Sequence, residues 1–450
     1  MTGTTQSPPG GLRDHPLRRA LIDEVHARPF AQVTAPQRAS HLALLTGEDP
    51  AEDRAQVAAL CAAHGVPPPG PEDTYLMADL GPFRLRWERH TEFSSYTFFP
   101  GPGYHDAGAP VFDDAAAPFA APVLDVVPRD WLAALPGQLL VGVHLELEAR
   151  DAPQRGEKAL TRLFGTDNIA GSVVSGGAAA VWMDFAVQAD GFGRVLLQDR
   201  GLRPRQAGRL VQRLFEIETY RMLALLALPL ARRHGAELSR SGERLTEMTA
   251  RLAAIEGLED ERRLLGELTR MSAEVEDMAA TASYRFAAAG AYDALVRRRV
   301  AELREARFEG MQTIGEFLER RLAPAMATCE AVAARLEARS DRVSRASQLL
   351  RTRIDIALEA QNGELLRSMD RRARLQLRLQ QTVEGLSVAA ISYYLVGLVG
   401  YAAKAAKAAG VALDAELLTG LSIPVVVGLV GFGVWRLRRL VVRDARNPDR

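Results

Sequence analysis

Two long uncharged stretches near the C-terminus constrain this chain more than any other feature of its sequence. The first, GLSVAAISYYLVGLVGYAA, covers residues 385–403, and the second, LLTGLSIPVVVGLVGFGVW, covers residues 417–435. Each has 19 residues, and a helix rises about 1.5 Å per residue, so each can cross a hydrocarbon core about 30 Å thick. We therefore predict a two-helix transmembrane hairpin over residues 385–435. The alternative is a helical hairpin buried in a soluble protein.

The charges around these stretches predict how the hairpin is oriented. Arginines precede the first stretch and follow the second, whereas the short connection holds two lysines and two acidic residues. Because positively charged flanks stay in the cytoplasm, we predict that both termini are cytoplasmic. The Ala- and Arg-rich usage is typical of a bacterium, so the expected location is the bacterial inner membrane. Residues 436–450 then form a basic cytoplasmic tail.

The N-terminal half predicts an α/β head domain over residues 13–203, after a disordered leader at residues 1–12 that has no signal-peptide core. Short β-branched and aromatic runs, separated by glycine-containing turns, indicate seven or eight strands in a mixed, largely antiparallel sheet. Hairpin signals occur at Ser175-Gly176-Gly177 and at Asp190-Gly191. A first helix over residues 16–27 is expected to dock its stripe of Leu17, Leu21 and Val25 on that sheet.

From residue 204 to residue 384 the pattern is helical and rich in mixed charge, which predicts a helical bundle or coiled-coil stalk. Pro229 and Gly235 are expected to end its first helix, and Gly310 and Pro324 to mark further breaks. The overall class is therefore α+β with a C-terminal transmembrane hairpin. The sequence leaves open whether one helix is continuous from residue 325 to residue 403.

Composition and motifs exclude several classes of function. The chain has 450 residues, of which 47% are apolar and 25% charged, and its formal net charge is zero. No global field favours nucleic acid, so we expect no nucleic-acid partner. The two cysteines, Cys61 and Cys329, lie far apart and are expected to be reduced thiols. No zinc-protease, hydrolase-elbow, CxxC or P-loop motif occurs, so we predict no catalytic residue, no metal site and no cofactor.

One segment concentrates ionisable and aromatic residues: RWERHTEFSSYTFF, residues 86–99. On a strand, alternation places Phe83, Leu85, Trp87 and Arg89 on one face. The other face then carries the ionisable side chains Arg84, Arg86, Glu88, His90 and Glu92. This pattern is typical of a solvated sheet face whose charges compensate one another. The alternative is that Glu88 and His90 bind a ligand or act as acid and base.

A second candidate lies in DEVHARPF, residues 23–30. His26 could cap the C-terminal carbonyls of its own helix, where a cation is favoured, and Pro29 holds Arg28 extended. Alternatively, His26 and Arg28 form an anion- or partner-binding corner together with the polar face of residues 86–92. The candidate ligand site is therefore the set His26, Arg28, Arg86, Glu88, His90 and Glu92.

Several blocks together resemble a bacterial family of uncharacterised, predicted membrane-anchored proteins, a domain of unknown function. They are HPLRRALIDEVHARPF, FRLRWERHTEFSSYTFF, GRLVQRLFEIETYRMLALLALPLAR, RTRIDIALEAQN and LQLRLQQTVEGLSVAAISYYLVGLVGY. The resemblance covers nearly the whole chain, from about residue 13 to about residue 440. The resemblance implies a membrane anchor and assigns no activity. The order of head, long helices and two C-terminal spans is also similar to CorA-type magnesium channels. Their Gly-Met-Asn motif is missing here, where the sequence reads GLVGYAAKAAKAAG.

Three hypotheses follow. The first is a non-enzymatic protein, anchored in the bilayer, that self-associates as a homo-oligomer through its stalk and glycine-rich spans and has no identified protein partner. The second is a CorA-like cation channel or transporter, whose pore would be lined by Ser387, Tyr394 and Tyr401, which repeat every seven residues. The third is an enzymatic or ligand-sensing head centred on the candidate ligand site.

Overall fold

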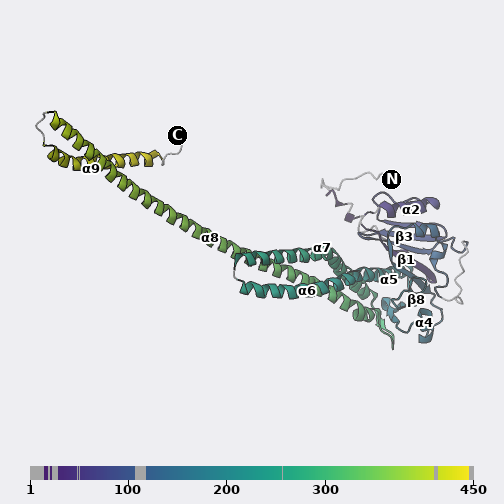
Figure 1. Ribbon diagram of the computed structural model, residues 1–450. Helices are drawn as coiled ribbons and strands as arrows, with labels where there is room; N and C mark the ends of the chain where they lie inside the picture. The colour runs from purple at the N-terminus through teal and green to yellow at the C-terminus, as the bar shows by residue number, and fades with distance from the viewer. Residues whose placement is uncertain are drawn as a thin grey trace, which may run out of the picture. The chain divides into compact units, whose positions relative to one another are not determined.

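The computed structural model describes residues 15–18, 21, 22, 29–47, 49, 51–106, 118–255, 257–409 and 414–444 (Figure 1). The chain forms two compact units. The first unit contains Met1–Ala254 and Gly266–Ser347, and the second contains Ile255–Leu265 and Gln348–Arg450. The predicted domain boundaries at residues 204 and 385 stay predictions.

Within the described residues, one nine-stranded sheet organises the first unit, with the strand order β2-β3-β4-β1-β5-β8-β7-β6-β9. Of these neighbours, β5 and β8 run parallel and the other pairs are antiparallel, which confirms the predicted mixed, largely antiparallel sheet. The strands are β1 Gln37–Leu45, β2 Tyr75–Asp79, β3 Phe83–Arg89, β4 Phe93–Pro100, β5 Gln138–Glu148, β6 Ala170–Val174, β7 Ala179–Met183, β8 Gly193–Asp199 and β9 Ala306–Arg307.

The glycines of the two predicted hairpins lie in turns, because glycine readily adopts the positive φ that these turns need. Ser175–Gly177 forms the tight turn between β6 and β7, with φ of +70° at Gly176 and +94° at Gly177. Gly191, with φ of +86°, lies in the turn before β8, where the Gln188 N–H donates to the Phe192 carbonyl. Both predicted hairpin turns are therefore present.

One face of the sheet carries the main hydrophobic core. Phe83, Leu85 and Trp87 are fully buried there, as alternation along β3 predicts. They pack with Tyr96 and Phe98 of β4 and beneath α2 (Ala51–Ala63). Two short helices, η1 (Val123–Val126) and α3 (Arg129–Ala133), pack against the same core. The helix α4 (Glu157–Phe164) covers a smaller core near β7 and β8.

Long helices follow the strands: α5 Pro204–Leu225, α6 Ala227–Ala254, α7 Leu258–Leu303, α8 Ile314–Ala408 and α9 Ala415–Asp444. Pro229 and Gly235 do not end a helix, contrary to the prediction. The break falls at Leu226, and Pro229 occupies the first turn of α6, where a missing N–H breaks no helical bond. Pro324 likewise lies inside α8, which is continuous through residues 325–403.

The polar face of β3 is not solvated, contrary to the first interpretation of its sequence. Arg86, Glu88 and Glu92 are only 4%, 8% and 7% exposed, because α5 and α7 cover this side of the sheet. The predicted first helix lies mostly outside the described residues. Its described leucines, Leu17 and Leu21, have exposed side chains and are not docked on the sheet.

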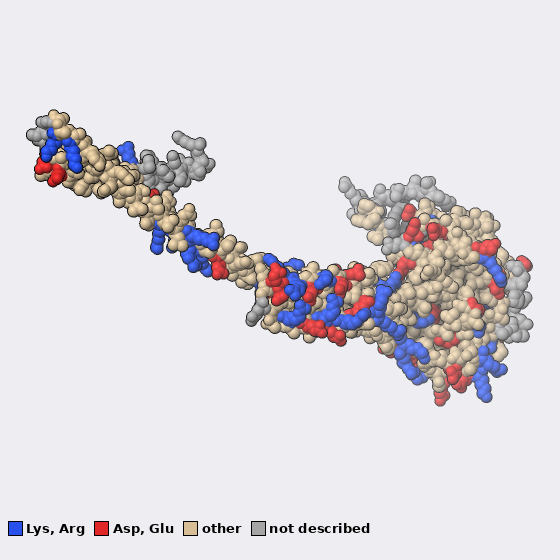
Figure 2. Space-filling view, in the orientation of Figure 1, with Lys and Arg blue, Asp and Glu red and all other residues tan. Residues whose placement is uncertain are grey.

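In the second unit, the last part of α8 and α9 are two apolar helices long enough to cross a membrane. Their most apolar windows are almost entirely unburied, unlike the core helix of a soluble protein. The two helices approach at small residues, since a Cβ on Gly400 would lie 3.3 Å from the Thr419 methyl group. Figure 2 shows few charged residues along this stretch, in contrast to the mixed charge along α6 and α7.

Candidate functional site: a buried charged cluster between sheet and helices

Strand register places three polar side chains in a row across the sheet. Arg86 of β3 lies opposite Thr97 of β4, and Thr97 lies opposite His41 of β1. Because alternation turns all three toward the same face, they meet the helix α5 that covers it. There, Phe215 and Thr219 contact His41.

A cavity of about 200 Å³ lies between this row and the helices. Arg86, Glu88 and His90 line it, so the structure brings three of the six predicted site residues together. Glu92 lies close by but is held by α7 instead. The remaining two, His26 and Arg28, lie outside the described residues. The helix side of the cavity is lined by Gln212, Phe215, Glu216, Thr219, Tyr220 and Arg299.

His41 is held rigidly at the floor of the cavity. Its Nδ1 lies 2.8 Å from the Thr97 hydroxyl, its Nε2 lies 3.1 Å from the Thr219 hydroxyl, and its ring stacks on Phe215 at 4.7 Å. Burial, together with the charges of Arg86 and His90, lowers the pKa of His41 to about 3. The ring is therefore neutral at physiological pH, and both of its nitrogens are already engaged by hydroxyl groups. This arrangement suits a structural role better than proton transfer.

The charges of the cavity are largely paired with one another. The Arg86 guanidinium donates to Glu88 at 2.9 Å and lies over the Tyr75 ring at 5.7 Å. On the helix side, Arg299 forms salt bridges with Glu216 and Glu302. The helices therefore carry ion pairs of their own, as the sheet does with Arg86 and Glu88. Two buried atoms of residues that line the cavity have no hydrogen-bond partner among the described residues: Nε of Arg86 and Oε1 of Gln212.

Glu92 connects the turn between β3 and β4 to α7. Two nitrogens of Arg285 donate to its carboxylate at 2.6 and 3.3 Å, and the Tyr292 hydroxyl donates at 2.8 Å. Burial and the hydrogen bond to Glu92 raise the pKa of Tyr292. We call Arg86, Glu88, His90 and Glu92, with their helical neighbours Glu216, Arg285 and Arg299, the charged cluster. It joins the sheet to the helices.

Sequence reasoning missed His41, Thr97, Thr219 and Arg299. The signal for His41 was its place directly before the apolar run of residues 42–45, where a polar residue needs a buried partner. Nothing in the sequence pairs that strand with a helix almost 180 residues later, or Glu92 with Arg285, 193 residues away. In the described part of the chain, no group of three His, Cys, Asp or Glu residues could hold a metal ion.

The predicted pore residues lie on one exposed side of α8. Tyr394 and Tyr401 are 72% and 74% exposed, and the hydroxyl of Ser387 donates to the Val383 carbonyl of its own helix. Ser392, in contrast, is buried. No observation here favours conduction, so a pore lined by Ser387, Tyr394 and Tyr401 stays a prediction.

Comparison with known families gives a match to one family model over nearly the whole chain. A family model described as "Protein of unknown function (DUF3422)" matches residues 13–441. The chain belongs to the DUF3422 family. This confirms the resemblance to a domain of unknown function, and membership itself assigns no activity to the charged cluster. No curated protein and no solved structure matches the chain.

Proposed function

We propose that this DUF3422 protein is a non-enzymatic membrane-anchored protein that self-associates through α8. The observation that carries the anchor is the exposure of large apolar side chains all around the last part of α8 and α9. They include Leu386, Tyr393, Leu398, Leu417, Leu421 and Leu429, each more than 60% exposed. Lipid removes the unfavourable contact of such surfaces with water.

The ends of the hairpin support a bilayer rather than a protein surface as its environment. Arg439 lies over the Trp435 ring at 3.8 Å, which combines an interfacial aromatic with a cation at the end of the span. Arginines also precede the first span, at Arg371, Arg372, Arg374 and Arg378. By the positive-inside rule we place both termini in the cytoplasm, at the inner membrane of a bacterium.

Fractionation tests the anchor. We expect the full chain to stay in the membrane pellet after an alkaline carbonate wash, and a chain that ends at Glu384 to move to the soluble fraction. If the full chain were extracted by carbonate, the two apolar helices would not be inserted and the proposal would be wrong.

Self-association is supported by an exposed stripe on α8 before the first span. Leu358, Leu365, Met369, Leu379 and Val383 follow heptad spacing. The last four are 58–70% exposed, which leaves an apolar seam available to other copies. Polar residues at three further positions of the seam, Asn362, Arg372 and Gln376, would favour one register and one oligomer number.

A matched pair of variants tests the seam. Met369→Glu introduces a charge in the seam, whereas Leu366→Glu introduces the same charge at a similarly exposed position off the seam. In detergent, light scattering coupled to size exclusion should show a smaller particle for Met369→Glu and an unchanged one for Leu366→Glu. Equal particle masses for both variants and the wild type would contradict association through this seam.

A second candidate, ligand sensing by the head, is favoured by the two unpartnered buried atoms of Arg86 and Gln212, two residues that line the cavity. Buried polar atoms are normally satisfied, and here one is a donor and the other an acceptor. A small molecule with both an anionic and a cationic group, such as a free amino acid, would complement them. We expect one of the common L-amino acids, at millimolar concentration, to raise the melting temperature of the wild type but not of Gln212→Leu. If none of them raises it, this candidate fails.

A further inference from the structure

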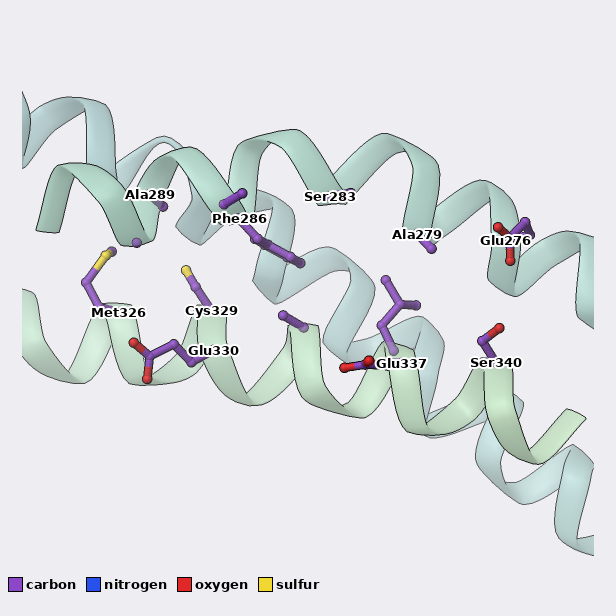
Figure 3. Close-up of a pocket in the computed structure, with 14 residues that line it drawn as sticks. Glu276, Ala279, Ser283, Phe286, Ala289, Met326, Cys329, Glu330, Glu337 and Ser340 are labelled. Atoms are coloured by element: carbon purple, nitrogen blue, oxygen red, sulfur yellow. The ribbon is translucent and has the colours of Figure 1, made fainter. Parts of the chain in front are cut away.

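An apolar groove of about 500 Å³ runs between α7 and α8 in the first unit, apart from the charged cluster (Figure 3). Its floor contains Ala289, Met326, Cys329 and Leu336, all at most 5% exposed. Its α7 side includes the small residues Ala279 and Gly290. Figure 3 shows the side chains of the two helices facing one another across it.

The dimensions of the groove match a helix. Its lining extends from residue 276 to residue 290 on α7 and from residue 326 to residue 340 on α8. At 1.5 Å per residue, each wall is about 20 Å long, the length of a helix of about four turns. A Cβ on Gly290 would meet no atom of another described segment within 4 Å, so another backbone can approach closely there.

The charges of the groove indicate the chemistry of its occupant. The described residues that line it include three glutamates, Glu276, Glu330 and Glu337, and no lysine or arginine. Within the described residues none of these three carboxylates forms a salt bridge or a hydrogen bond. Elsewhere in the same helices glutamates are paired with arginines: Glu267 with Arg251, Glu274 with Arg244 and Glu302 with Arg213.

We propose that this groove docks an amphipathic α-helix of another protein, with small or aliphatic residues on one face and arginines or lysines on both flanks. The apolar face would cover the floor, and the cations would pair with the three glutamates, in the helix-in-groove mode of recognition. A second copy of this chain is a poor occupant through the same surface, because symmetric docking would place the glutamates against one another.

The test is a binding titration of the full chain in detergent against a labelled synthetic peptide. The peptide is a helix of about four turns, with leucine and alanine on one face and arginine on both flanks. A peptide of the same composition in shuffled order, without an apolar face, is the control ligand. We expect saturable binding of the amphipathic peptide and much weaker binding of the shuffled one.

Two variants locate the site. Gly290→Leu fills the groove and should abolish binding, whereas Gly266→Leu, on the same helix but outside the groove and equally free of neighbours, should not. Leucine favours the helix over glycine at both positions, so both variants should fold. The triple variant Glu276→Gln, Glu330→Gln, Glu337→Gln should weaken binding about tenfold, from the sum of three exposed charge pairs.

Three results would overturn the proposal. The first is equal binding by Gly290→Leu and Gly266→Leu. The second is equal binding of the amphipathic and shuffled peptides, which would indicate charge attraction alone. The third is a change of oligomer mass in Gly290→Leu without added peptide, which would assign the groove to contacts between copies of this chain.

Discussion

The neutral state of His41 leads to a pH-dependent stability that can be worked out from its surroundings. Its pKa is about 3 in the folded protein, against an ordinary value of 6.5. Below pH 6.5 the unfolded chain therefore binds a proton at this ring that the folded chain does not bind. Because the unfolded state holds more protons, the free energy of unfolding falls as the pH falls from 6.5 toward 3, by about 1.4 kcal/mol per pH unit.

His41→Gln removes this titration. Between about pH 7.5 and about pH 4.5, the wild type should lose about 2.5–3 kcal/mol of stability through His41 that the variant does not lose. At the higher pH, the difference in unfolding free energy between the variant and the wild type measures the packing that the substitution itself removes. Other buried groups with shifted pKa values, such as His144 and Asp53, occur in both proteins and cancel in the comparison.

Urea unfolding in a nonionic detergent measures this difference by tryptophan fluorescence. Trp87, Trp131 and Trp182 are buried in the first unit and report its unfolding. The stability gap between wild type and His41→Gln should shrink, or reverse, on acidification. Parallel curves for the two proteins across this range would show that His41 is not buried in its neutral form, and the assignment of its environment would be wrong.

Two further substitutions, with a third as a control, test the packing of the first unit. Arg285→Met leaves the buried carboxylate of Glu92 without its cation and should lower the free energy of unfolding by about 3 kcal/mol. If urea titrations showed a loss of unfolding free energy below about 0.5 kcal/mol, the buried ion pair between Arg285 and Glu92 would be refuted. Gly208→Ala places a Cβ 1.7 Å from the Ala31 carbonyl oxygen, so the backbone must move and stability should fall by about 3 kcal/mol. The same change at Gly266, which has no described neighbour within 4 Å, should slightly raise the melting temperature.

The sequence predicted the strands of the head because alternation and turn chemistry are local. The burial of Phe83 and Trp87 and the turns at Gly177 and Gly191 follow from neighbouring residues alone. The burial of Arg86 could not be predicted in this way. A polar strand face has the same alternation whether water or a charged helix covers it. The covering residues lie more than 120 positions away on α5, and Arg299 of α7 lies more than 200 positions away.

The helix end predicted at Pro229 and Gly235 was wrong for a related reason. A proline in a helix interior removes a helical hydrogen bond, whereas a proline in the first turn, such as Pro229, removes none. The sequence does not show which position the proline occupies. The two-residue strand β9 is too short for any periodicity. It exists because the chain after α7 returns to β6, where Val173 lies opposite Ala306.

The return of the chain to β6 after α7 makes the sheet of the first unit depend on the helices for its stability. Removing everything after residue 203 would take away β9, the Arg285 partner of Glu92, and the helix that covers His41. The sheet would then expose a face whose charges are arranged for helical partners, and Ser172 would lose the Glu305 carboxylate to which it donates at 2.6 Å. Since buried charges without partners are strongly destabilising, we expect residues 1–203 alone to lack a cooperative unfolding transition, and residues 1–347 to show one. A sharp transition with dispersed amide NMR signals for residues 1–203 would mean that the sheet is stable without its helices, and that the charged cluster is a contact between two independent domains.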